Sequence, residues 1–301
     1  MVKRYFVFPF LSLVTLVLLA ALGTTSVYAQ FYVLQGDDPG LAAALAGSPP
    51  CSIIMITSMG AGAPLPFTSS YTLGPGDSGK KIMAAPGETA LFIWSGGAPP
   101  FTVAGATNVV LENLVITGNA AGAGVQVDPG SVVKIINCQI ACNVHGVYVR
   151  SSSMAEIEGS RILNNAGFGV YLESLPPGTV GATATIEKTQ VRNNQTGVVL
   201  RGTSGKAKIW HSMIDKNTGN GVQVHVGNSA VLNNNDISFN GANGVGFDPG
   251  ALGSLSFNTI AYNTAAGVVS AAPVKVNPGH NTLEGNSPNF AGQPFLLPNQ
   301  F

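Results

Sequence analysis

Short apolar runs separated by polar turns fill most of the chain, and this pattern predicts β-strands rather than helices. From Asn108 onward one phrase recurs: an apolar residue, two variable residues, Asn, a short Gly-containing turn, and then Gly-Val-x-apolar. Runs such as Val147-Tyr148-Val149 supply the strand character, and no repeat has room for a helix of ten residues. The pattern therefore predicts a repetitive, all-β chain.

The repeat is regular along three columns of residues. The glycines that open each phrase differ by 22, 23, 28, 24, 23 and 23 residues, and they are Gly124, Gly146, Gly169, Gly197, Gly221, Gly244 and Gly267. The asparagines of the phrase are Asn119, Asn143, Asn165, Asn194, Asn217, Asn240, Asn263 and Asn286. An apolar residue stands three positions before each Asn, from Ile116 to Leu283. Eight matches in phase predict a β-solenoid in which one repeat forms one coil.

Stacked coils place equivalent residues about 4.8 Å apart, which is the spacing of hydrogen-bonded strands. The Val that follows each repeat glycine, from Val125 to Val268, then forms an apolar column that points inward. We expect the Asn column in a turn, where Asn tolerates left-handed geometry and its amide can bond the Asn of the next coil.

The phrases Asn108-Val-Val-Leu-Glu-Asn-Leu-Val-Ile-Thr-Gly118 and Asn164-Asn-Ala-Gly-Phe-Gly-Val-Tyr-Leu172 carry a family resemblance. The chain resembles the right-handed parallel β-helix repeat proteins of the pectin-lyase-like superfamily over about residues 36–290. This resemblance implies an all-β, right-handed parallel β-helix of about nine or ten coils of about 23 residues. It says little about activity, because one fold carries many chemistries.

The sequence divides into four parts. Residues 1–29 have the features of a signal peptide: Lys3 and Arg4, an apolar run to Leu22, and a cleavage site before Gln30. Residues 30–107 form an N-terminal cap and the first coils, residues 108–286 the β-helix repeats, and residues 287–301 a closing tail. We expect Asp38 to cap a short helix that covers the open core. The protein is expected to be secreted, extracellular or periplasmic, with no membrane span after cleavage.

Charge and cysteine content narrow the range of functions. Lys and Arg together number 14 and so do Asp and Glu, only 9% of the chain, which disfavours a nucleic-acid partner. Three cysteines, Cys51, Cys138 and Cys142, allow at most one internal disulfide, and its pairing stays open. Their spacing does not indicate zinc, and we expect no metal or cofactor; calcium is possible but not supported, because acids are not clustered. The oligomeric state stays open.

Candidate chemistry lies on the outer side of the strands that follow the repeat glycines. Four residues past these glycines stand Asp128, Arg150, Glu173, Arg201, His225 and Asp248. Two residues past them stand Gln126, Tyr148, Tyr171, Val199, Gln223 and Gly246. Strand alternation sends both sets outward when the Val column points inward. The single 28-residue repeat inserts residues after Glu173, where a lip over this face is expected.

One interpretation of these columns is a polysaccharide groove. Tyr148 and Tyr171 would stack on sugar rings, Gln126 and Gln223 would bond hydroxyls, and Asp128, His225 and Asp248 would complete the contacts. Arg150 and Arg201 would pair with uronate carboxylates. In a lyase an Arg could act as base or charge stabiliser, and in a hydrolase Asp128 and Glu173 would flank the bond. The candidate catalytic residues are therefore Arg201, Glu173 and Arg150.

The alternative is a surface charge ladder, because the signs alternate from Asp128 through Arg150 and Glu173 to Arg201. Exposed pairs contribute about 0–1 kcal/mol each and would fix the register of the coils. The sequence thus predicts a secreted carbohydrate-contacting or surface structural module, without demonstrated catalysis. A polysaccharide lyase or glycoside hydrolase that acts on a uronate polymer is the alternative, so whether the protein is an enzyme stays open.

Overall fold

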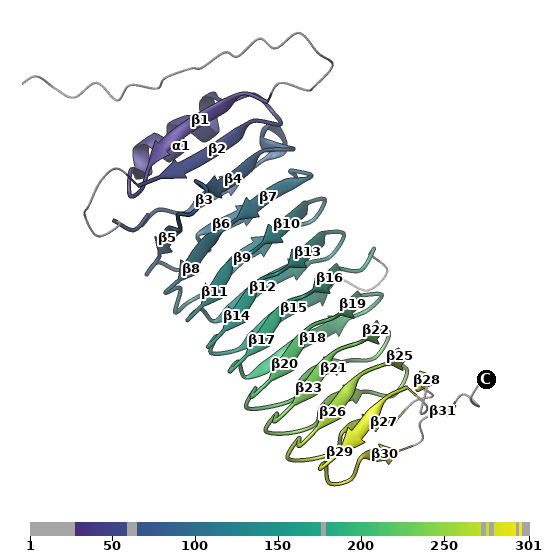
Figure 1. The fold of residues 1–301 in the computed structure, drawn as a ribbon. Coiled ribbons are helices and arrows are strands. Elements are labelled where there is room, and N and C mark those ends of the chain that lie inside the picture. The colour runs from purple at the N-terminus through teal and green to yellow at the C-terminus, as the bar shows by residue number, and fades with distance from the viewer. Residues whose placement is uncertain are drawn as a thin grey trace, which may run out of the picture.

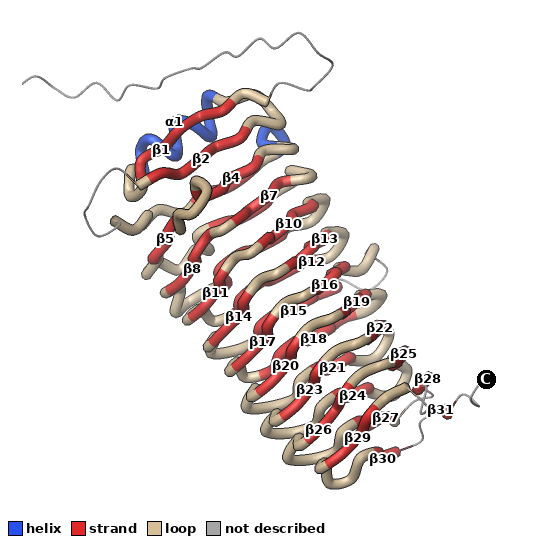
Figure 2. Tube along the Cα trace, in the orientation of Figure 1, coloured by secondary structure: helices blue, strands red, loops and turns tan. Residues whose placement is uncertain are grey.

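The chain folds into a β-solenoid in which successive coils stack along one axis (Figures 1 and 2). The computed structural model describes residues 28–58, 65–175, 179–271, 275–276, 280–292 and 295–296. Within these residues three parallel sheets of 12, 9 and 10 strands run the length of the molecule. The predicted all-β parallel solenoid is confirmed. It has about 11 coils rather than nine or ten, because coil strands begin at Gln30 and continue into the tail.

From β4 to β30 each coil contributes one strand to each sheet in the order A, B, C, whereas β1, β2 and β31 are added to sheet A and β3 to sheet C. Sheet A contains β1 (Gln30–Leu34), β2 (Ile53–Thr57), β4 (Lys81–Ala84), β7 (Val109–Glu112), β10 (Val132–Ile136), β13 (Met154–Glu158), β16 (Thr183–Glu187), β19 (Lys206–Trp210), β22 (Ser229–Asn233), β25 (Leu252–Ser256), β28 (Lys275–Val276) and β31 (Phe295–Leu296). Sheet B contains β5 (Ala90–Ile93), β8 (Leu114–Thr117), β11 (Gln139–Ala141), β14 (Arg161–Leu163), β17 (Gln190–Arg192), β20 (Met213–Asp215), β23 (Asp236–Ser238), β26 (Thr259–Ala261) and β29 (Thr282–Glu284). Sheet C contains β3 (Tyr71–Leu73), β6 (Phe101–Val103), β9 (Ala123–Val127), β12 (His145–Arg150), β15 (Phe168–Ser174), β18 (Thr196–Gly202), β21 (Val222–Val224), β24 (Val245–Phe247), β27 (Val268–Ser270) and β30 (Phe290–Gly292). A short 3-10 helix, η1 (Pro75–Asp77), lies between β3 and β4.

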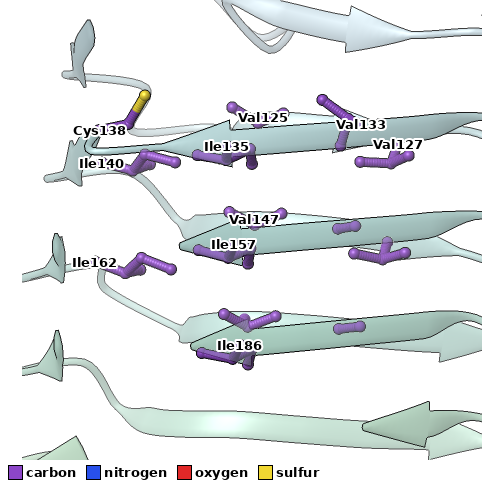
Figure 3. Close-up of a cluster of buried hydrophobic side chains, with 14 of the residues drawn as sticks. Val125, Val127, Val133, Ile135, Cys138, Ile140, Val147, Ile157, Ile162 and Ile186 are labelled. Carbon is purple, nitrogen blue, oxygen red and sulfur yellow. The ribbon is translucent and has the colours of Figure 1, made fainter. Parts of the chain in front are cut away.

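The core is an apolar column enclosed by the three sheets. The predicted Val column is confirmed, because Val125 pairs with Val147, and the register continues coil by coil to Val268. Every member is at most 1% exposed. Figure 3 shows Val125 and Val147 beside Ile135 and Ile157 of sheet A. Burying a side chain of this size contributes about 1.5–3 kcal/mol to the free energy of unfolding, so burial of this column between stacked coils favours folding.

A ladder of buried asparagines joins the coils at the corner between sheets B and C. Asn194 donates from its backbone N and from its side-chain Nδ2 to the Oδ1 of Asn217, at 2.9 and 3.1 Å. Asn217 makes the same two bonds to Asn240, at 3.1 and 3.0 Å. The predicted amide-to-amide bonding is confirmed. These groups are buried, and each rung satisfies donors that water cannot reach.

The left-handed residue at this corner is not the ladder Asn, as we expected, but the residue before it. Asn164, Asn193 and Lys216 have φ of 54°, 55° and 55° and directly precede ladder asparagines. This shift has a physical reason, because the turn reverses at the exposed residue, and the ladder Asn can then point its amide along the stack.

A second ladder lies at the corner between sheets A and B, and its members differ in type. The backbone N of each member except the last donates to the side-chain oxygen of the member in the next coil, along Cys138, Ser160, Thr189, Ser212, Asn235, Asn258 and Asn281. Hydroxyl and amide oxygens are both acceptors, so the residue type can vary while the bond is kept.

Three aromatic residues occupy left-handed corner positions in the last coils. Phe239, Phe257 and Tyr262 have φ of 56°, 58° and 55°, where bulky side chains are outliers. Such residues cost on the order of 1–3 kcal/mol each. Phe239 stacks on Tyr262 with ring centroids 5.3 Å apart, and a stacked pair contributes about 0.5–1.5 kcal/mol. Stacking therefore does not offset the strain of two such residues.

The helix α1 (Asp38–Gly47) confirms the predicted N-terminal capping helix, and its buried Leu41 and Leu45 belong to the core cluster. Its N-cap is Asp37, whose Oδ1 accepts from Gly40 N at 2.9 Å, so the expectation that Asp38 caps the helix is wrong. At the other end, buried Lys80 donates from Nζ to Leu45 O at 2.5 Å.

Asp38 instead ties the helix to the first coils. Its carboxylate accepts hydrogen bonds from Thr68 N at 3.0 Å, from Ser69 N at 3.0 Å and from the Tyr71 hydroxyl. The apolar run of the expected signal peptide lies outside the described residues. Across the described segments, no helix is long and apolar enough to span a membrane.

We predict that Asn217→Ala destabilises the solenoid strongly. The substitution leaves the Asn194 backbone N and Nδ2 without their acceptor, and unsatisfied buried donors cost about 1–3 kcal/mol each. Thermal and urea unfolding, followed by circular dichroism, should show the loss. Asn233→Ala is the control, because Asn233 is half-buried and makes one bond of 3.3 Å to Ser256. Equal effects of the two substitutions would contradict a structural role for the ladder.

We also predict a pH-dependent N-terminal cap. Burial alone would raise the pKa of Asp38, but hydrogen bonds from Tyr71, Thr68 and Ser69 outweigh it and hold the pKa below the usual 3.8. Its contribution to stability is therefore present above pH 3.8 and is lost as the pH falls through the folded pKa. Hydrogen exchange of α1 amides should accelerate in that acid range. An Asp38→Asn variant should lack this acid step, and an unchanged step would contradict the assignment.

Candidate functional site

The outer face of sheet C holds the residues singled out by the sequence. Strand pairing aligns Gln126, Tyr148, Tyr171, Val199, Gln223 and Gly246 coil by coil. Arg150, Glu173 and Arg201 are likewise aligned on β12, β15 and β18. Asp128, His225 and Asp248 directly follow β9, β21 and β24. The two predicted columns therefore lie on one face, which we call the sheet C face.

Glu173 lies at the centre of this face and is held by two tyrosines. The hydroxyls of Tyr148 and Tyr171 donate to its two carboxylate oxygens, the latter at 2.8 Å. The two rings stack with centroids 5.1 Å apart and planes 10° apart. Burial and the Glu173 carboxylate raise the pKa of Tyr148 well above its usual value, and they raise that of Tyr171 to about 12. Both hydroxyls therefore stay protonated near neutral pH.

Two further rings, Phe168 and His145, pack beside this tyrosine pair and form what we call the aromatic wall. Phe168 meets the Tyr171 ring edge to face at 5.0 Å, and His145 stacks on Phe168 at 5.1 Å. The Nδ1 of His145 accepts from Phe168 N at 3.1 Å, and burial lowers the pKa of His145, so the ring is neutral with its proton on Nε2. Both residues directly precede a repeat glycine, and comparing that position between repeats would have revealed them.

The wall changes the role expected for Tyr171. Its side chain is only 6% exposed, so its ring faces Tyr148 and Phe168 rather than solvent. The expectation that Tyr171 stacks on a sugar ring does not fit this burial. Tyr148 is half-buried and presents what remains accessible of the stack.

The two arginines differ in their partners. Arg150 is 46% exposed and contacts Asp128 at 3.2 Å. The hydrogen bond to Asp128 outweighs desolvation and raises the pKa of Arg150. Arg201 is exposed, and within the described residues no carboxylate oxygen lies within 4.0 Å of its guanidinium. The expected charge ladder is thus interrupted, because the Glu173 carboxylate is taken by tyrosine hydroxyls.

Side-chain hydrogen bonds also form at each end of the sheet C face. The Nε2 of Gln126 donates to Asp128 at 2.9 Å. In the later coils Asp248 accepts from Gln223 Nε2 at 2.9 Å and lies 2.7 Å from His225 Nδ1. Asp128 and Asp248 therefore each orient a glutamine and a cationic or titratable neighbour.

The described residues include no cluster of three His, Cys, Asp or Glu side chains that could hold a metal ion. All three cysteines are free. Cys138 is buried at the corner between sheets A and B, with Sγ 3.4 Å from Leu111 O, whereas Cys142 is exposed. Cys138 faces the core and Cys142 faces solvent, so the two do not pair although they are close in sequence.

Two hollows in the described residues lie away from the sheet C face. One of about 480 Å³ crosses the corner between sheets A and B beside Glu88, Gln139 and Arg161. Another of about 270 Å³ lies at the insertion of the long repeat, beside Val180 and Lys206. The expected lip falls partly on residues 176–178, which lie outside the described residues.

We predict that Glu173→Gln lowers the pKa of Tyr171 from about 12 toward 10, because it removes the anion that disfavours a phenolate. Spectroscopic titration of the tyrosines, with circular dichroism to check folding, measures this. Glu156→Gln on sheet A is the control, since Glu156 pairs with Lys134 and should not affect the tyrosines. Identical titration curves for the two variants would contradict the Glu173 contacts.

Comparison with known proteins agrees with this architecture. The family model described as "Right handed beta helix region" matches residues 93–237 and 196–290, but no curated protein matches the sequence. An alginate lyase from Paenibacillus sp. str. FPU-7 is 14% identical with a TM-score of 0.56, covering 89% of this chain and 99% of that one. The enzymatically active domain of bacteriophage CBA120 tailspike protein 2 is 12% identical with a TM-score of 0.57, covering 88% and 44%. Pectate lyase Pel9A is 14% identical with a TM-score of 0.51, covering 82% and 67%.

At these identities the solved structures show a common fold and no more, whereas the family model covers well over half of the chain. The protein belongs to the family of right-handed parallel β-helix proteins, with the pectin-lyase-like fold.

Proposed function

We propose that the protein binds an acidic, uronate-containing polysaccharide along the sheet C face. The observation that carries this proposal is the state of Arg201, which is exposed and has no carboxylate partner within the described part of the chain. It lacks one because Tyr148 and Tyr171 hold Glu173. A planar guanidinium binds carboxylates through two parallel hydrogen bonds, so a uronate group is a fitting ligand.

The spacing of the face supports a chain that runs along the solenoid axis. Arg150 and Arg201 lie two coils apart, which is about 9.6 Å at the spacing of parallel strands. A uronate polymer offers a carboxylate on each sugar unit, so two charges of one chain could reach the two arginines. Tyr148, on the same strand as Arg150, offers part of an aromatic ring, and Gln223 lies in the coil after that of Arg201. The similar structures include an alginate lyase and a pectate lyase, whose names refer to polysaccharides of this class.

The same contacts favour binding over cleavage. A hydrolase requires two available carboxyl groups, but Asp128 is engaged by Arg150 and Gln126, and Glu173 by the tyrosines. Asp128 raises the pKa of Arg150, so its guanidinium does not accept a proton as a base would. Tyr148 has a raised pKa and can donate a proton but not abstract one at neutral pH. A lyase on the same polymer is the alternative, with Arg201 neutralising the carboxylate.

We also propose that the protein works outside the cytoplasm, where such polymers occur. The apolar stretch up to Leu22 and the small residue at Ala29 support export. The first strand, β1, begins at Gln30, so cleavage at the expected position would leave every described strand intact.

Retention on polygalacturonate and alginate, measured by affinity electrophoresis, tests the proposal. Wild-type protein should be retarded, and added salt should weaken retention because the contacts are ionic. Arg201→Gln should weaken binding by about tenfold, which is about 1.4 kcal/mol. Arg161→Gln is the matched control, because Arg161 is exposed on sheet B, away from the face.

Equal losses from the two substitutions, or no retention of wild-type protein on any uronate polymer, would overturn the proposal. The same incubations should be read for unsaturated uronate products. Product that requires Arg201 would establish the lyase alternative in place of simple binding.

A further inference from the structure

Exposed aromatic rings gather at both corners of sheet B in the last coils. At the corner between sheets B and C, the stacked rings of Phe239 and Tyr262 are 55% and 52% exposed. At the corner between sheets A and B, Phe257 is 56% exposed and stacks on His280, with centroids 4.5 Å apart. In Figure 1 the strands between these corners, β23, β26 and β29, lie at the C-terminal end of the solenoid.

Phe and Tyr are unfavourable residue types at these left-handed corner positions. Earlier coils hold several residue types at the left-handed corners: Asn137, Asn164, Asn193 and Asn234, and also Cys142, Lys188, His211 and Lys216. Asn adopts positive φ readily, whereas Phe and Tyr are strained there. The rings gain little burial in return, and their stacking does not offset the strain. Stability of the fold therefore does not explain them.

The chain also makes room for the Tyr262 ring. The next corner residue is Gly285, with φ of 63°, and a Cβ there would lie 2.4 Å from the ring of Tyr262. The ring thus lies across bare backbone and keeps its outer part in solvent. Strained residues whose surroundings hold them in place are typical of ligand clamps.

A polar shelf separates the two aromatic corners. Phe257 and Tyr262 are five residues apart across β26, a span of about 16 Å at the rise of a strand. On the shelf, Thr259, Thr282 and Glu284 are exposed, and Asp236 is partly exposed. Ala261 and Ser238 keep the surface low, because their side chains are small and buried. Hydroxyl and carboxylate groups thus lie between two aromatic rims.

We propose that this aromatic-rimmed shelf binds an uncharged polysaccharide. A pyranose ring has an apolar C–H face that packs on an aromatic ring and hydroxyls around its edge that bond polar side chains. Asp236 and Glu284 on the shelf repel a polyanion. An apolar protein partner would require a continuous apolar patch, but the rings are separated by polar groups. The shelf is distinct from the sheet C face and takes a different class of glycan.

Affinity electrophoresis in gels that contain mixed-linkage β-glucan, xyloglucan or galactomannan tests this inference. The wild-type protein should be retarded by at least one of these polymers. Tyr262→Asn and Phe239→Asn should each weaken retardation by at least tenfold, with a melting temperature equal to or above that of wild type. Tyr32→Thr is the control, because Tyr32 is 49% exposed on β1 at the other end of the molecule.

Three outcomes would overturn the inference. They are no retardation by any neutral polymer, equal retardation of the wild type and both Asn variants, and melting temperatures that fall in the Asn variants while retardation is unchanged. Retention on uronate polymers should be the same in the Asn variants and the wild type, so failure here is separable from failure of the sheet C proposal.

Discussion

The in-register hydrogen bonding of one coil to the next is the constraint on which the rest of the structure depends. Backbone pairing sets the spacing of the coils, and the buried side-chain ladders at two corners fix their phase. A slip by one residue would turn the Val column outward and leave buried amides unpaired. Because the phase is fixed, any residue at one position of the repeat lies beside its equivalents in the neighbouring coils. The scaffold thereby converts a sequence column into a surface row.

That conversion explains how much could be predicted. Asn at one position of each repeat predicted the ladder between sheets B and C, and the Gly-Val phrase predicted the core column. The second ladder escaped because Ser160, Thr189 and Asn235 supply the same acceptor from different residue types. The predicted helix cap was wrong by one residue. Asp37 and Asp38 are both residue types that cap helices, and only the tertiary contact of Asp38 with Tyr71 distinguishes them.

The positions of the candidate residues on sheet C were predicted, but their side-chain contacts were not. Register alone placed Arg150, Glu173 and Arg201 in one row, and alternating signs suggested ion pairs between them. Tyrosine hydroxyls compete for the central carboxylate, and strand alternation does not reveal how far a ring reaches across coils. The charges of the row are as predicted, but the Glu173 carboxylate accepts hydrogen bonds from neutral tyrosine hydroxyls and makes no ion pair with Arg201. Arg201 is therefore exposed and has no carboxylate partner within the described part of the chain.

The most direct test is the structure of the protein in complex with a uronate oligosaccharide. We expect the sugar chain to lie along sheet C with one carboxylate on the guanidinium of Arg201. An oligosaccharide bound elsewhere, or Arg201 in contact with Glu173 and not with the sugar, would contradict the account.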